Sequence, residues 1–141
     1  MTEKEEGEIK EIIKPLLVSR KKIEEKLKEL VSKVKPFISI EEETGKVLFN
    51  RTDITNKEKI ALLLIGNYFA EIGKIISSSG LTMREISQAL NLPITTIPAP
   101  LGELIRSGYI EKTNNTYKVR PFQIEKILNE IIEKYGEKDD K

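Results

Sequence analysis

The amino-acid sequence predicts a mostly helical α+β protein, and three observations lead to this fold class. Apolar residues recur at alternating steps of three and four through the first 35 residues, the spacing of an amphipathic helix. Two Thr-x-x-Glu boxes, Thr55 to Glu58 and Thr82 to Glu85, have the pattern that begins a capped helix. Residues 37–50 and 109–120 place apolar residues on both sides of a turn, as β-hairpins do.

Composition limits the chemistry of the chain. Its 141 residues include 24 Lys and Arg against 23 Asp and Glu, so the formal net charge is +1. That balance argues against a surface that is basic throughout, although a local basic patch is compatible with it. The chain has no His, Cys or Trp. Zinc sites built on Cys or His, Ser–His and Cys–His catalysis, and disulfides are therefore excluded. We expect no enzyme activity, no metal and no cofactor.

The same sequence predicts a cytoplasmic protein. Its longest unbroken apolar stretch, residues 60–65, is far shorter than the ~20 residues of a membrane span. The acidic N-terminus has no apolar leader segment. Enrichment in Lys and Glu without Cys is typical of a thermophile, although an AT-rich genome favours the same Lys codons.

Residues 1–36 are predicted to form one long amphipathic helix that ends at Lys35-Pro36. Its apolar stripe has coiled-coil spacing from Ile9 onward, with one polar interruption at Arg20. Pro15 either kinks this helix or marks its true first turn. The stripe is a candidate homodimer seam, and the alternative is that it packs on the chain's own core. The candidate dimerisation residues are Ile13, Leu16, Ile23, Leu27, Leu30 and Val34.

A β-hairpin and linker are predicted over residues 37–56. The strands are expected near residues 37–41 and 46–50, with Thr44-Gly45 in the turn. The first capping box then begins a largely apolar helix that runs to about Ser77.

The second half of the chain continues with short elements. A helix is predicted from Thr82 to Leu90, followed by an Asn91-Leu92-Pro93 turn. The next helix is expected to begin between Thr95 and Ala99 and to run to Arg106, with Gly108 closing it. A hairpin turns at residues 113–115, and Tyr109 and Tyr117 are expected to pair across it. Residues 121–141 are predicted as a helix from Pro121 that Gly136 ends, with a frayed tail.

Residues 57–120 resemble the winged helix-turn-helix family, and in particular small archaeal-type DNA-binding regulators. The resemblance depends on the string LTMREISQALNLPITTIPAPLGELIRSGYIEKTNNTYKV. It implies that residues 82–90 are the first helix of the motif, residues 95–106 the recognition helix and residues 109–120 the wing. The full prediction is thus a winged helix with an additional N-terminal helix and hairpin and a C-terminal helix.

A protein that binds DNA contacts phosphates through basic side chains, hydroxyls and helix N-termini. The segment 109–120 has three basic residues and one acidic residue, a local charge of +2. The alternative interpretation is a solvated hairpin whose lysines serve solubility. The candidate nucleic-acid contacts are Thr82, Arg84, Thr95, Thr96, Arg106, Lys112, Asn114, Asn115, Lys118 and Arg120.

The recognition segment departs from the family pattern. It has no basic residue before Arg106, and it contains Pro98 and Pro100. If Thr96 were the N-cap, Pro100 would remove the first backbone hydrogen bond, so a late, short helix is expected. Binding through phosphates and DNA shape is then easier to build than base recognition.

These observations predict a homodimeric transcription or chromatin factor that binds double-stranded DNA, with RNA or the ribosome as other targets. The alternative is a module that docks on a protein or ribonucleoprotein such as RNA polymerase. The uncharged residues Ile97, Pro98, Pro100 and Leu101 are the candidate protein-binding surface of that alternative.

Overall fold

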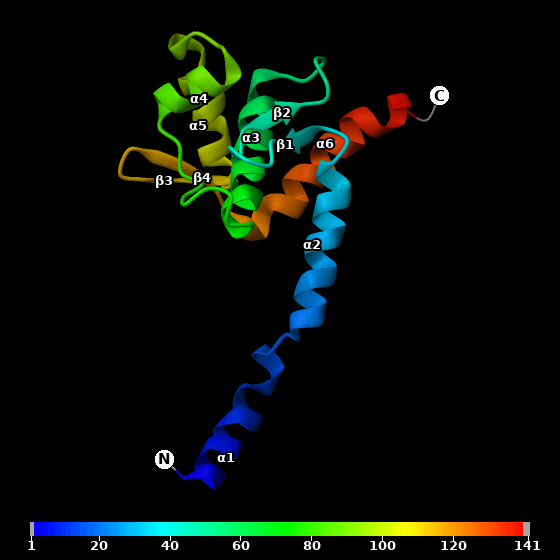
Figure 1. Ribbon diagram of the computed structural model, residues 1–141, viewed down its shortest axis with the longest axis vertical. Helices are drawn as coiled ribbons and strands as arrows, with labels where there is room; N and C mark the ends of the chain where they lie inside the picture. The colour runs from blue at the N-terminus through cyan, green and yellow to red at the C-terminus, as the bar shows by residue number, and fades with distance from the viewer. Residues whose placement is uncertain (1, 140–141) are drawn as a thin grey trace.

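The computed structural model describes residues 2–139, and its architecture is α+β and mostly helical, as predicted (Figure 1). Two antiparallel hairpins, β1–β2 and β3–β4, are its sheets. In chain order the elements are α1 (Glu3–Ile13), the 3₁₀ turn η1 (Lys14–Leu16), α2 (Arg20–Val34), β1 (Ile38–Ile40), β2 (Val47–Phe49), α3 (Asn56–Ile72), α4 (Met83–Leu90), the 3₁₀ turn η2 (Ile94–Thr96), α5 (Pro98–Arg106), β3 (Ile110–Thr113), β4 (Thr116–Val119), the 3₁₀ turn η3 (Pro121–Gln123) and α6 (Ile124–Asp139). No helix in this described part of the chain is long and apolar enough to cross a bilayer.

The prediction of one helix over the first 35 residues is wrong. α1 ends at Ile13, and Pro15 lies in η1. A proline has no backbone N–H and its ring clashes with the preceding turn, so the α-helix stops there. Leu17 is extended, and Ser19 caps the start of α2 by accepting a 3.2 Å hydrogen bond from the Lys22 amide.

The predicted seam is divided between two environments. Leu30 and Val34 are buried in the chain's own core, where α2 packs on α6, so they are not free to form a dimer seam. Leu27 is half-buried. Ile13, Leu16 and Ile23 are exposed. The apolar stripe of the first 35 residues therefore has two parts: its C-terminal residues lie in the core, and its N-terminal residues lie on the surface.

Polar side chains fix α2 beside α6. The Lys26 ammonium lies 2.5 Å from the Glu125 carboxylate, and the Lys33 ammonium lies 3.4 Å from the same carboxylate. Lys33 also donates to the Asn129 side-chain oxygen at 3.0 Å. Further along, the Phe37 and Tyr135 rings meet edge to face. The two helices therefore run side by side in the same direction.

The N-terminal hairpin confirms the prediction, with β1 and β2 paired antiparallel. Its turn needs a glycine, because Gly45 has a φ of +77° and a Cβ there would lie 2.6 Å from Ile76 Cγ2. The Glu41 carboxylate accepts from the Thr44 amide at 2.6 Å and from the Thr44 hydroxyl. These hydrogen bonds lower the pKa of Glu41, so this carboxylate belongs to the turn.

α3 is the central helix and is covered by both hairpins, α5 and α6 (Figure 1). Its predicted capping box is present, with Thr55 and Glu58 each accepting from the other's backbone amide. Residues 60–67 are all buried, because α3 has neighbours on every side. The helix ends at Ile72 rather than near Ser77, and Lys74 takes a left-handed φ of 60° two residues later.

The next helices follow the predicted order. Thr82 and Glu85 form the second capping box, and Asn91 ends α4 in the left-handed conformation. α5 begins late, as expected, but its N-cap is Ile97 and not Thr96. Pro98 and Pro100 thus take the first and third helical positions, where an N–H has no partner within the helix.

The last elements complete the core. β3 and β4 turn at Asn114, whose φ is 57°. The predicted pairing of Tyr109 with Tyr117 is wrong, because Tyr117 lies opposite Lys112. α6 continues through Gly136 to Asp139, so Gly136 does not end it, and residues 140–141 of the predicted tail lie outside the described residues. The preceding residue, Tyr135, is buried in the core.

Candidate nucleic-acid interface

Backbone pairing holds the start of α4 against the second hairpin. The Leu81 amide donates to the Tyr117 carbonyl at 3.1 Å, and the Tyr117 amide donates to the Leu81 carbonyl at 2.8 Å. Leu81 is the residue just before the Thr82 N-cap. The bridge therefore places the first turn of α4 beside the β3–β4 turn.

Four of the ten predicted nucleic-acid contacts meet at this junction. Thr82 and Arg84 of α4, with Lys112 and Asn115 of the hairpin, line a pocket of about 270 Å³ together with Met83 and Tyr117. We call this the α4–wing pocket. Its lining has two cations, two hydroxyls and an amide, and no carboxylate. Such groups are the usual ligands of a phosphate.

The two cations of the α4–wing pocket are available to a ligand. Arg84 and Lys112 are exposed, and neither forms an ion pair with a described carboxylate. The Lys112 ammonium lies 5.7 Å from the centre of the Tyr117 ring, which positions it without neutralising its charge. Glu85 is near in sequence, but its carboxylate accepts from the Thr82 amide at 2.9 Å.

The remaining predicted contacts do not line this pocket. Thr95 and Thr96 are exposed on η2, where the Thr96 hydroxyl donates to the Pro93 carbonyl at 2.7 Å. Asn114 is exposed at the hairpin turn. Lys118 is half-buried, and its chain lies across Gly80, where a Cβ would be 3.2 Å from Lys118 Cε.

Two arginines occupy positions that sequence reasoning did not anticipate. The Arg106 guanidinium folds back over Gly102, where a Cβ would lie 3.3 Å from Nη1. The missing side chain thus lets Arg106 reach toward the start of α5. Arg120 lies at the base of the hairpin, half-buried, and its buried Nε has no hydrogen-bond partner among the described residues.

The predicted protein-binding surface on α5 needs a correction. Ile97 and Leu101 are in the core, because α5 turns this face toward α3. Pro98 is exposed and Pro100 is half-buried. The exposed apolar side chain near this end of α5 is Ile94 of η2.

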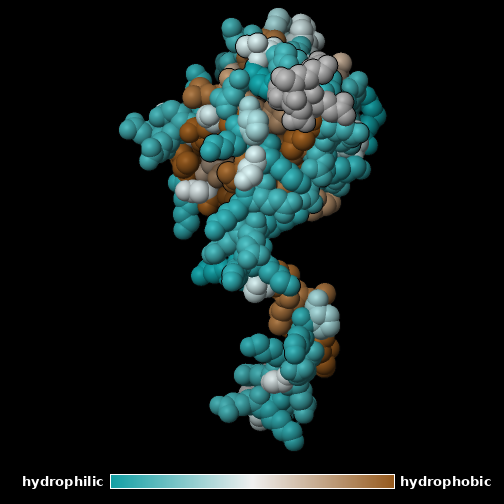
Figure 2. Space-filling model, turned by 90° about the vertical axis from the view of Figure 1, so that its right-hand side faces the viewer, coloured by the Kyte–Doolittle hydropathy of each residue, from teal (hydrophilic) through white to brown (hydrophobic). Residues whose placement is uncertain are grey.

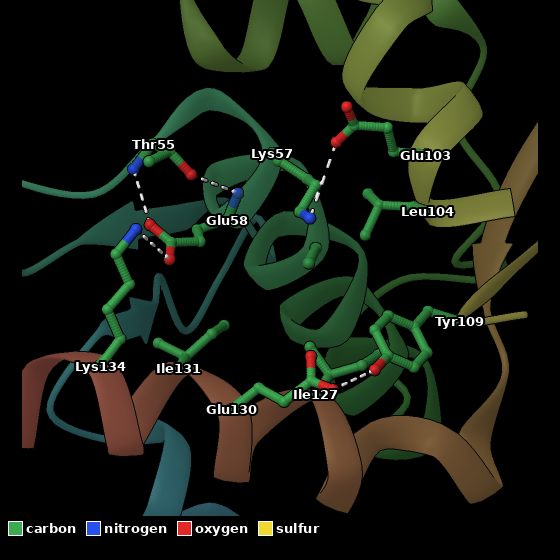
Figure 3. Close-up of a pocket in the computed structure, with 11 residues that line it drawn as sticks. Thr55, Lys57, Glu58, Glu103, Leu104, Tyr109, Ile127, Glu130, Ile131 and Lys134 are labelled. Atoms are coloured by element: carbon green, nitrogen blue, oxygen red, sulfur yellow. Dashed lines mark hydrogen bonds and ion pairs between the residues drawn. The ribbon is translucent and has the colours of Figure 1, made fainter. Parts of the chain in front are cut away.

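A larger pocket of about 470 Å³ lies between α3, α5 and α6 (Figure 3). Two ion pairs occur among its lining residues: Lys57 lies 3.6 Å from Glu103, and Lys134 lies 3.2 Å from Glu58. The Tyr109 hydroxyl donates to Glu130. The apolar residues that line this pocket are Ala61, Leu104, Ile127 and Ile131.

The acid–base groups of this larger pocket are committed to one another. Burial, and then the hydrogen bond to Glu130, raise the pKa of Tyr109 to about 12. Burial acts to raise the pKa of Glu58, but hydrogen bonds from Tyr135 and Thr55 and the nearby Lys134 outweigh it, and the pKa is lowered. Tyr109 thus stays protonated and Glu58 ionised at neutral pH. No group of three or more acidic side chains that could hold a metal occurs among the described residues.

Sequence reasoning missed the contacts that join α6 to the rest of the protein. Tyr135, Glu58 and Glu125 have partners 77 to 99 residues away along the chain. A signal for Tyr135 is its place in the stripe of Ile124, Ile127, Leu128 and Ile131, since it continues the same helical spacing.

Comparison with known protein families, with curated protein sequences and with solved structures gave no match to this chain.

Proposed function

We propose that residues 57–120 form a winged helix and that the chain binds double-stranded nucleic acid as a transcription or chromatin factor. The α4–wing pocket is the observation that supports this most directly. It joins two cations that form no ion pair with a described carboxylate to a helix N-cap and a hairpin turn. Both elements project polar groups that suit a phosphate backbone.

The order of α3, α4, α5, β3 and β4 supports the winged-helix assignment. In such a fold α5 would approach the major groove and the β3–β4 hairpin would act as the wing. The exposed groups at the start of α5 are Thr95, Thr96, Pro98 and Ala99, none of them charged. Binding would then depend on phosphates and DNA shape more than on base contacts.

The test measures binding to a random-sequence DNA duplex by fluorescence anisotropy at 50 and 200 mM salt. Two phosphate contacts predict a loss of affinity of about tenfold over this range. The variant R84E/K112E should bind much more weakly and lose most of the salt dependence.

The matched control is K74E/K126E, which makes the same change in net charge at exposed lysines outside the α4–wing pocket. This control should retain most of the affinity. Equal losses in the two variants would mean that only total charge matters, and absence of binding at 50 mM salt would refute the proposal.

One observation favours a protein-docking function instead. Ile94 is exposed on η2, beside the uncharged start of α5. A docking surface here predicts that I94D abolishes retention of a partner from nuclease-treated extract while duplex binding is unchanged. Partners that disappear with nuclease would support the nucleic-acid function.

A further inference from the structure

The N-terminal arm, residues 3–26, projects from the body of the protein (Figure 1). No residue of α1 is buried. Isolated helices shorter than about 12 to 15 residues are marginal in water, and α1 has 11. A helix of this length therefore needs a partner surface to be stable.

The arm also exposes apolar side chains. Leu16 is 80% exposed and Ile12 is 75% exposed. Figure 2 shows that hydrophobic atoms gather on the arm where α1 joins α2, between hydrophilic surfaces on either side. The exposed apolar residues are Ile9, Ile12, Ile13, Leu16, Leu17, Val18 and Ile23. A contiguous apolar surface of this kind marks an interaction site.

Charge identifies the partner. α1 has five Glu and two Lys, a net charge of −3, while α2 has six Lys and Arg and three Glu, a net charge of +3. Pairing α1 with a second α1 would repel, whereas pairing α1 with α2 would attract. The chain thus contains both complementary surfaces.

We propose that two copies of this chain exchange arms, so that α1 of each copy lies antiparallel along α2 of the other. The extended conformation of Leu17 directs α1 away from its own α2. The same pairing made between two copies satisfies both arms, which is the logic of an exchanged dimer.

The apolar positions agree with this antiparallel arrangement. Ile9 and Leu27 are each nine residues from Val18, and Ile13 and Ile23 are each five residues from it. A two-fold axis near Val18 therefore places Ile9 opposite the partner's Leu27 and Ile13 opposite the partner's Ile23. Leu30 and Val34 lie beyond this seam, in the core of their own chain.

The first experiment measures the mass of the full-length chain by sedimentation equilibrium. Two variants reverse one charge each at residues that face each other in this register, E8K in α1 and K28E in α2. Each variant alone should weaken self-association by about tenfold or more, because both now place like charges together. An equimolar mixture should restore the dimer, because each reversed helix then meets an opposite charge.

The second experiment determines the pairing geometry. The chain has no Cys, so single cysteines can be introduced without background. I13C mixed with I23C should give a mixed disulfide, because these positions face each other in this register, and I13C alone should give little. All these changes are at exposed residues, where they should leave the thermal unfolding of the body unchanged.

Three results would overturn the arm exchange: a monomer at all concentrations, no recovery in the charge mixture, or efficient self-linking of I13C. None of these measurements uses nucleic acid, so arm exchange can fail while duplex binding through the α4–wing pocket stands, and the reverse is equally testable.

Discussion

The Tyr135 hydroxyl, near the end of α6, donates a 2.5 Å hydrogen bond to the Glu58 carboxylate in the first turn of α3. The same carboxylate oxygen accepts a 2.8 Å hydrogen bond from the Thr55 amide. The Glu58 side chain therefore both caps α3 and binds α6. The Arg51 guanidinium lies 4.9 Å from the centre of the Tyr135 ring. This cluster fixes the C-terminal helix to the centre of the fold.

Removing the hydroxyl should destabilise the protein. Y135F keeps the ring but leaves the buried Glu58 carboxylate with one donor fewer, at an expected cost of about 1 to 3 kcal/mol. Urea unfolding at pH 7 measures this cost. In a Glu58→Gln background the same change should cost much less. Equal costs in both backgrounds would show that the Tyr135 hydroxyl does not stabilise the protein through Glu58.

Glu58 should also make the protein sensitive to acid. Its pKa in the folded state is lowered below the ordinary value of 4.5, so its contribution to the unfolding free energy is present above about pH 5. It is lost as the pH falls through the folded-state pKa. Unfolding free energies between pH 3 and pH 6 should therefore fall more steeply for the natural chain than for E58Q.

Tyr109 should make the stability of the protein sensitive to alkali. Its pKa is raised from 10.0 to about 12, so the folded state retains a proton that the unfolded state loses. The stabilising effect is complete below pH 10 and disappears as the pH rises toward 12. Denaturation between pH 9 and pH 12 should show a smaller decline for Y109F, and identical curves would contradict the assignment.

Two glycines should respond in opposite ways to alanine. At Gly45 the positive φ and the nearby Ile76 methyl leave no room for a Cβ, so G45A should cost about 1 to 3 kcal/mol in unfolding free energy. At Gly7 nothing lies within 4 Å, and alanine favours helix by about 0.5 to 1 kcal/mol. G7A should thus increase α1 helicity, measured by circular dichroism, without lowering the thermal midpoint.

The two halves of the predicted seam should differ in their effect on stability. L30A removes a buried side chain and should cost about 2 to 5 kcal/mol. I12A removes an exposed one and should change the stability of the isolated chain by less than about 0.5 kcal/mol. Thermal unfolding of dilute samples compares them, and similar losses would place Ile12 in the core.

Local chemistry accounts for what the sequence predicted well. The Thr55 and Thr82 capping boxes and the left-handed Asn91 depend on neighbours within four residues, and the structure has all of them. Pro15 acts through equally local chemistry, because it has no backbone N–H and its ring clashes with the preceding turn, so α1 ends at Ile13.

Tertiary contacts account for what the sequence did not show. Helical spacing alone cannot distinguish Leu30, which is covered by α6, from Leu16, which is exposed. For the same reason the sequence predicts Ile97 on a protein-binding surface, although the structure buries it against α3. Arg84 and Lys112 were each identified as candidate contacts, but their meeting in one pocket follows from the backbone bridge between Leu81 and Tyr117.

The extended link after η1 has a consequence for how the polypeptide is degraded. Every residue of the hydrophobic core lies at Leu30 or beyond, so cleavage near Val18 would leave the core intact. A protease given the free protein should therefore remove a short acidic peptide first and then stop at a resistant fragment. The backbone at this link is exposed and extended, which is the kind of site that proteases cleave.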